Sequence, residues 1–184
     1  DASLGIGVER VAAIDEQIAL LKQGTGTLTL GSANSYSVGT TLGAGVLHVY
    51  TPLSLGASGA LTFTGGTLLF GPGVSTDWSP RFAPLGAGTL AFVDVGANNI
   101  SFAGSLSGLG GLTKSGSGQL VLAAANTFAG SVSVNAGLLN LQHPLALGGT
   151  ATGTTVAPGA TLQVQGDIFL GAEALTLSGA GVTG

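Results

Sequence analysis

The chain has 184 residues and a formal net charge of −4, with 8 acidic and 4 basic side chains. Charged residues make up 7% of it, against roughly 25% in a typical soluble domain. The four cations are scattered, which excludes the basic patch of a nucleic-acid-binding protein or of a protein held at an anionic membrane. The chain has no cysteine, so it forms neither a disulfide nor a thiolate nucleophile. No apolar run approaches the roughly 18 residues of a membrane-spanning helix, so we expect no membrane insertion by this segment.

The first predicted element, residues 8–23, is ambiguous. Its apolar residues from Val11 to Leu21 recur at helical spacing, which favours a short capping helix. An internal repeat, described below, aligns Ile14 with Leu106, just before a strand pattern. We therefore expect a strand here and keep the capping helix as the alternative.

From residue 27 onward, short runs alternate apolar with small polar residues, and Gly, Asn, Pro or Ser bound each run. This pattern is typical of short strands joined by tight turns. No helical pattern separates the runs, so we predict an all-β chain. The predicted strands lie in residues 27–30, 46–50, 60–70, 89–95, 99–106, 119–123, 131–141 and 161–166, with one or two more in 167–179.

The sequence also repeats itself. Residues 22–56 align with residues 114–148 without a gap, so that Lys22 matches Lys114. A closed barrel or a sandwich needs no long internal repeat, whereas a solenoid is built from such repeats. We therefore predict a parallel β-helix with turns of roughly 20 to 25 residues. It forms a single segment, 1–184, of about two divergent repeats, 21–112 and 113–184.

Stacking accounts for the shortage of charge and for the corner residues. Equivalent side chains of neighbouring turns lie about 4.8 Å apart. At that distance like charges repel, whereas Thr, Ser and Asn pair with one another. We expect Gly45 and Gly137 at corners that need positive φ or close backbone approach. Asn34 and Asn126 are expected at matching corners, because Asn tolerates the left-handed region and bonds to nearby backbone.

The stretch GGLTKSGSGQLVLAAANTFAGSVSVNAGLLNL resembles the autotransporter-associated β-strand repeat, also called the passenger-associated transport repeat. The resemblance is most specific at 111–148. The first copy diverges, with Val38 where the second copy has Gly130. The resemblance implies a right-handed β-helix in the passenger of a large secreted or surface-displayed protein of a Gram-negative bacterium. It assigns no catalytic residue to the repeat.

The densest polar and aromatic cluster is STDWSPRFAP, which contains Asp77, Trp78 and Arg81. One interpretation is a sugar-binding patch in which Trp78 supplies a stacking face. The alternative is a loop held by packing of Trp78 and Phe82, with a surface pairing of Asp77 and Arg81 that contributes at most about 1 kcal/mol. The alternative is favoured, because a binding patch needs several converging polar groups.

Nothing in the sequence makes a case for catalysis. His48 and His143 have no acidic residue or second histidine nearby, as a metal site or a catalytic base would need. Asp15 and Glu16 are adjacent and would point to opposite faces of a strand. We therefore predict no catalytic residue, no metal and no cofactor.

The leading functional hypothesis is a non-catalytic structural and surface-display segment, such as a stalk, a fibre or an autotransporter passenger. Its partners would be neighbouring repeats of the same chain, with end-to-end self-association as a further expectation. An adhesin module that binds glycans or cell surfaces through Trp78 is the alternative. A polysaccharide-active β-helix enzyme is a remote third.

Overall fold

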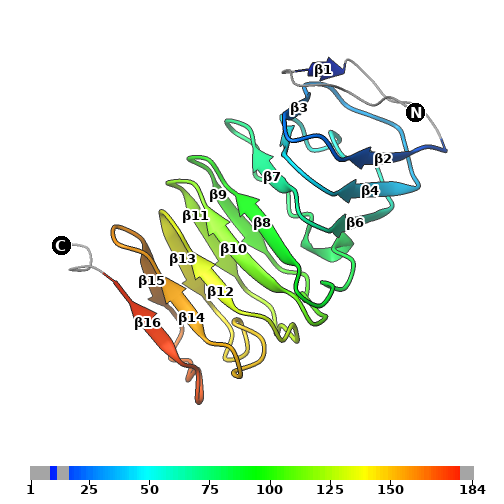
Figure 1. The fold of residues 1–184 in the computed structure, drawn as a ribbon. Coiled ribbons are helices and arrows are strands. Elements are labelled where there is room, and N and C mark those ends of the chain that lie inside the picture. The colour runs from blue at the N-terminus through cyan, green and yellow to red at the C-terminus, as the bar shows by residue number, and fades with distance from the viewer. Residues whose placement is uncertain (1–8, 12–16, 179–184) are drawn as a thin grey trace.

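The computed structural model describes residues 9–11 and 17–178, which fold as a parallel β-solenoid (Figure 1). A nine-stranded sheet runs along the whole stack. A three-stranded sheet accompanies its first part and a four-stranded sheet its second part. All pairs of neighbouring strands are parallel. The predicted all-β parallel β-helix is confirmed.

The strands are three to five residues long. The nine-stranded sheet contains β1 (Glu9–Val11), β3 (Thr27–Leu30), β5 (Val46–Val49), β7 (Thr67–Phe70), β8 (Leu90–Asp94), β10 (Gly111–Ser115), β12 (Val132–Val134), β14 (Thr154–Val156) and β16 (Leu175–Leu177). The three-stranded sheet contains β2 (Ala19–Lys22), β4 (Gly39–Leu42) and β6 (Ala60–Phe63). The four-stranded sheet contains β9 (Asn99–Phe102), β11 (Gln119–Leu122), β13 (Leu138–Leu141) and β15 (Thr161–Val164).

The ambiguous segment 8–23 contains β1 and β2, so the strand prediction holds where the structure describes it. Residues 8 and 12–16 lie outside the described residues. Within 9–11 and 17–178, the helical structure consists of one short 3₁₀ turn, η1 (Ser79–Arg81). No helix among these residues combines the length and the apolar character of a membrane span.

Alternation along each strand sends aliphatic side chains inward and small or polar ones outward. In β11, Leu120 and Leu122 are buried, whereas Gln119 and Val121, which alternate with them, are half-buried. Parallel pairing in register then places Leu120 beside Leu139 of β13. Each fully buried Leu or Val stabilises the fold by about 1.5–3 kcal/mol relative to an exposed one. The core is therefore a set of aliphatic columns that run along the stack.

The two sequence repeats do not lie on the same sheets. Lys22 ends β2 in the three-stranded sheet, whereas its repeat partner Lys114 lies in β10 of the nine-stranded sheet. Leu28 of β3 lies in the nine-stranded sheet, whereas its repeat partner Leu120 lies in the four-stranded sheet. The second repeat is thus displaced by one sheet around the stack, which the sequence repeat alone does not reveal.

The displacement occurs between β7 and β8. Paired residues of the nine-stranded sheet are 19 to 22 positions apart in every other pair, as in Thr27 with Val46 and Val132 with Thr154. Across this step they are 25 apart, as in Thr67 with Phe92. The three-stranded sheet ends at β6 and the four-stranded sheet begins at β9. We call residues 71–89, which span this change, the junction segment (Figure 1).

Candidate functional site

Lys114 points into the core, in a column whose other members from β3 to β16 are aliphatic. Its neighbours in the column are Val93 and Val134, and its side chain is fully buried. The Nζ atom donates to the carbonyl oxygens of Gly116 at 2.7 Å, Gly118 at 2.6 Å and Ala136 at 2.7 Å. These three bonds satisfy the ammonium group and join two successive turns. Burial lowers the pKa of Lys114 from 10.5 to about 8, against an opposing effect of Asp94.

Lys22 forms the same clip in the first repeat. Its Nζ donates to the carbonyl oxygens of Gly24 and of Ala44, the latter at 3.0 Å. Burial lowers its pKa as well. Because Ala44 is the repeat partner of Ala136, the local contact is preserved although the two lysines lie on different sheets. We call each lysine with its carbonyl ligands a lysine clip.

Gly45 and Gly137 complete the clips. Both have φ of +66°, the left-handed conformation expected at a corner. A Cβ at Gly137 would lie 2.5 Å from the carbonyl oxygens of Gly116 and Gly118 and 2.6 Å from Lys114 Nζ. Any side chain would therefore displace the ammonium group.

Asn34 and Asn126 also lie at equivalent corners. Asn126 Nδ2 donates to the Ala146 carbonyl at 2.5 Å, and its Oδ1 accepts from the Leu106 amide at 2.7 Å. Asn34 Nδ2 donates to the Ser54 carbonyl at 2.6 Å. Neither asparagine has a positive φ. Among the described residues, the non-glycine residue with a positive φ is Asp167, at +54°. Their role is hydrogen bonding between turns, not left-handed backbone.

The predicted cluster Asp77, Trp78 and Arg81 lies in the junction segment. Trp78 is 2% exposed, and its ring packs on Phe70 with centroids 5.1 Å apart. Asp77 Oδ1 accepts from the Ser79 amide and hydroxyl at 2.8 and 2.6 Å, and Oδ2 accepts from the Ala103 amide at 2.9 Å. A sugar-stacking face needs an exposed ring, and the ring of Trp78 is buried in this structure. Its burial agrees with the loop-packing alternative, although the ring contact of Trp78 is with Phe70, and those of Phe82 are with Phe63 and Phe102.

Arg81 does not bind Asp77 but clasps the loop of the preceding turn. Its guanidinium donates to four carbonyl oxygens: Gly59 at 2.8 Å, Gly56 at 3.1 Å, Leu55 at 2.8 Å and Ser58. These bonds tie the junction segment to the loop 55–59, between β5 and β6. Aromatic rings fill the space where the sheets change, with Phe82 4.9 Å from Phe63 and 5.3 Å from Phe102, centroid to centroid.

The two histidines differ in their surroundings. His48 lies on the outer face of β5, with its ring centroid 4.4 Å from that of Tyr50. Burial lowers the pKa of His48, against a smaller opposing effect of Asp94. His143 Nδ1 accepts from the Leu145 amide at 3.0 Å in an exposed turn. No group of three His, Cys, Asp or Glu side chains able to hold a metal occurs among the described residues.

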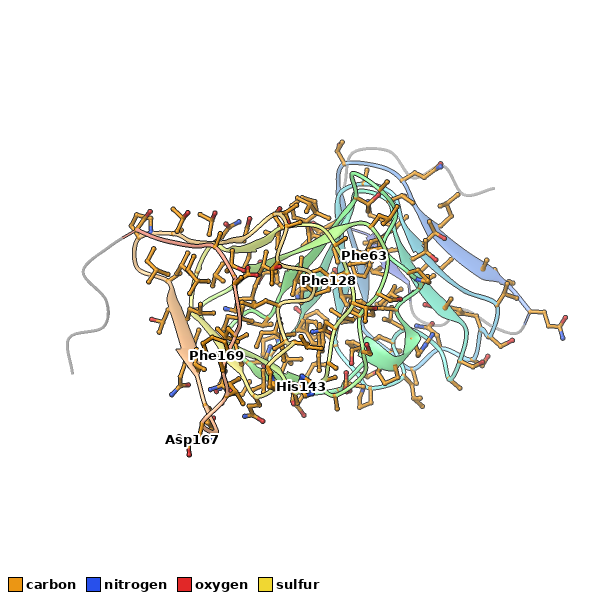
Figure 2. All side chains as sticks on the ribbon, turned by 90° about the horizontal axis from the view of Figure 1, so that it is seen from below. Phe63, Phe128, His143, Asp167 and Phe169 are labelled. Carbon is orange, nitrogen blue, oxygen red and sulfur yellow. The ribbon has the colours of Figure 1, made fainter. Side chains whose placement is uncertain are left out.

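The C-terminal end of the described stack leaves inward-facing residues uncovered. In one inward column the exposed fraction is 0% at Val134, 4% at Val156 and 64% at Leu177. Phe169 is 82% exposed at the same end, where Figure 2 shows it near Asp167. Phe63 and Phe128, also labelled there, are buried within the stack.

Two segments of the chain, residues 20–49 and 112–141, match the family Passenger-associated-transport-repeat. The chain carries two passenger-associated-transport-repeats. Both matches contain a lysine clip. The first match covers most of β2 to β5, and the second covers most of β10 to β13, their counterparts in the second repeat. The family resemblance drawn from the sequence is confirmed.

A relative of this repeat protein is the "Adhesin BmaC autotransporter" of Brucella suis biovar 1 (strain 1330), which is 38% identical over 163 residues. The match covers 82% of this chain and 5% of the relative, so the chain corresponds to a small part of that protein. No solved structure matches the chain significantly. The repeat family and the adhesin relative favour a non-enzymatic role.

Sequence reasoning aligned Lys22 with Lys114 but assigned no role to either. A signal was present: two of the chain's four cations occupy matched positions, each followed by glycine two and four residues later. A single cation between aliphatic strands needs hydrogen-bond acceptors. Nearby glycines let the backbone come close to the ammonium group, so that backbone carbonyl oxygens can serve as these acceptors. The pairing of His48 with Tyr50 was also missed, although two residues spaced by two on a strand share a face.

Proposed function

We propose that this chain is a non-catalytic structural segment of a secreted autotransporter passenger, displayed at the surface of a Gram-negative bacterium. The observation that carries the proposal is the presence of two passenger-associated-transport-repeats within one continuous β-solenoid. The interior of the stack is filled by aliphatic and aromatic side chains. Lys114 and Asn126, two of its buried polar side chains, bind backbone groups of neighbouring turns. Such a stack serves as a stiff spacer.

The segment consists, in this proposal, of two divergent repeats, 21–112 and 113–184, within a longer repeat protein. The small share of the autotransporter relative that the chain covers supports this. The partners are neighbouring turns of the same protein, and a second copy can associate at the uncovered end.

The proposal is tested by displaying the segment on the surface of a bacterial cell. The chain is placed between an N-terminal epitope tag and an autotransporter translocator in a Gram-negative host. We expect antibody to label the tag on intact cells and the segment to resist a protease that digests an unfolded linker of equal length. Absence of the tag from the surface, or digestion at the rate of the linker, contradicts the proposal. A variant with Lys114→Met and Lys22→Met serves as the matched control, because it weakens the stack and leaves the export signals unchanged.

A second function, adhesion, is favoured by the relative, whose name describes it as an adhesin. The adhesive surface expected from the sequence was centred on Trp78, which is buried. An adhesive role therefore needs another surface on the side of the rod.

A further inference from the structure

The outer face of β5 carries two neighbouring aromatic rings. Leu47 and Val49 of this strand are fully buried, so His48 and Tyr50 point outward. Their ring centroids are 4.4 Å apart and the planes are tilted by 44°. Tyr50 is 39% exposed. Among the described residues, the other aromatic side chain with comparable exposure is Phe169, which lies at the uncovered end.

Tyr50 stands beside a fixed glycine backbone. A Cβ at Gly71, the next residue in line on the following turn, would lie 3.0 Å from Tyr50 Cδ1, so the ring lies close against this backbone. Asn98 holds the glycine segment: its Nδ2 donates to the Gly71 carbonyl at 3.0 Å and its Oδ1 accepts from the Gly73 amide at 2.8 Å. The ring is thus supported by a braced main chain, and a preorganised face binds at lower entropic cost.

Polar groups flank the rings on the same face. His48 is paired with Leu69, and Leu69 with Asp94, so the Asp94 carboxylate lies two strands away, about 10 Å along the sheet. Burial lowers the pKa of His48, so its ring is neutral at pH 7 and presents one N–H donor and one acceptor nitrogen. The Asp94 carboxylate disfavours polyanions such as nucleic acids or acidic polysaccharides at its end of the face, and Arg10, in register with His48 through Thr29, lies at the opposite end.

The second repeat shows that the stack does not require these rings. The repeat partners of the inward Leu47 and Val49 are Leu139 and Leu141, so the inward chemistry is retained. The outward His48 and Tyr50 correspond instead to an asparagine and a glutamine, at 140 and 142. Packing therefore explains the inward residues of β5 but leaves the aromatic pair without a structural reason.

We propose that His48, Tyr50 and Asp94 form a binding face for a neutral saccharide. The apolar C–H face of a sugar ring stacks on Tyr50, and sugar hydroxyls bond to the His48 nitrogens and the Asp94 carboxylate. This inference rests on the adhesive function proposed above and gives it a ligand class and a location. The site lies on the nine-stranded sheet, on the side of the rod, where it stays accessible when turns stack at the ends.

The test is saturation-transfer NMR on the whole chain with maltohexaose, cellohexaose, mannohexaose and chitohexaose as probes, each at about 1 mM, a concentration that detects weak single-ring stacking. We expect transfer to at least one of these sugars, with Tyr50→Ala weakening binding about tenfold or more. Tyr50→Phe keeps the stacking ring and should bind within about threefold of the unmodified chain. Phe169→Ala is the matched control, an exposed aromatic far from the face, and should leave binding unchanged.

Three results overturn this proposal: no transfer to any of the four sugars, binding that survives Tyr50→Ala, or equal loss in Tyr50→Ala and Phe169→Ala. Binding to polygalacturonate alone overturns it too, since that ligand is anionic. Circular dichroism of each variant confirms that the stack is intact, as expected for surface substitutions. Failure here leaves the structural proposal standing, because surface display of the segment is measured separately and does not depend on Tyr50.

Discussion

At the scale of single residues, two cations lie in or beside the core and both are held by backbone carbonyls. Lys114 is fully buried with three such bonds, whereas Lys22 is slightly exposed and has two. A buried ammonium is tolerated only when its donors are satisfied. Each lysine clip therefore joins two neighbouring turns through one charged side chain and backbone carbonyls. It needs no second charged side chain, which would repel an equivalent charge in the next turn.

Replacing Lys114 by Met keeps the aliphatic stem and removes three donors. We expect the free energy of unfolding at pH 7 to fall by about 2–3 kcal/mol, because three buried carbonyls lose a charged partner. Lys22→Met is the internal control and should cost less, because Lys22 has fewer bonds and more water. Urea titrations measure both. Equal losses in the two variants, or none for Lys114→Met, would show that the clip does not stabilise the stack.

The buried ammonium also makes stability depend on pH. The pKa of Lys114 is lowered from 10.5 to about 8 in the folded chain, chiefly by burial. Between pH 8 and 10.5 the unfolded chain therefore binds more protons than the folded chain, so the free energy of unfolding rises with pH across this window. Lys114→Met should remove most of this rise. A fall in stability from pH 8 to 10.5 in the unmodified chain would mean that the carbonyl bonds outweigh desolvation.

At the scale of elements, the junction segment is the place where the stack depends on one sheet. Elsewhere in 17–164, successive turns are joined by two parallel sheets, but only β7 with β8 continues across this step, with three paired residues. A single bridge, Leu61 with Phe82, adds to it. The remaining links are side chains, chiefly the Arg81 clasp on the loop 55–59 and the aromatic rings beside it.

We therefore expect the parts of the stack before and after the junction segment to unfold separately. Hydrogen exchange followed by mass spectrometry in increasing guanidinium should give one free energy for peptides of 19–70 and another for those of 90–164. Arg81→Met should lower protection in 19–70, whose loop carbonyls lose their donors, and leave 100–164 unchanged. A single shared free energy, or a uniform loss of protection in Arg81→Met, would mean that the chain unfolds as one unit.

The sequence predicts the strands and the repeat, because alternation and corner residues are local signals. It predicts the corner contacts as well: Asn34 and Asn126 make matching hydrogen bonds in the two copies. It does not predict the displacement by one sheet, because this depends on how residues 71–89 fold between the aligned segments 22–56 and 114–148. Arg81 illustrates the same limit: the sequence suggested a pairing with the nearby Asp77, whereas the guanidinium binds carbonyl oxygens of the loop 55–59 in the preceding turn.

At the scale of the whole molecule, the chain is a stack whose stability comes from contacts between neighbouring turns. The last described turn has no cover over β15 and β16 among the described residues, and its inward side chains, including Val164 and Leu177, are exposed. Unpaired strand backbone next to exposed aliphatic residues favours addition of further strands. The central claim is that turns of this kind stack along one axis, so that a second copy can add at the uncovered end of the described stack.

Sedimentation velocity over a wide range of concentration, with electron micrographs of the same samples, tests that claim most directly. The account predicts reversible growth of the sedimentation coefficient with concentration and rods that lengthen in steps of one segment. Leu177→Asp, which places a charge on the uncovered end, should suppress the growth without unfolding the chain. A monomer at every concentration would contradict the account, because it would mean that the ends of the stack are already protected.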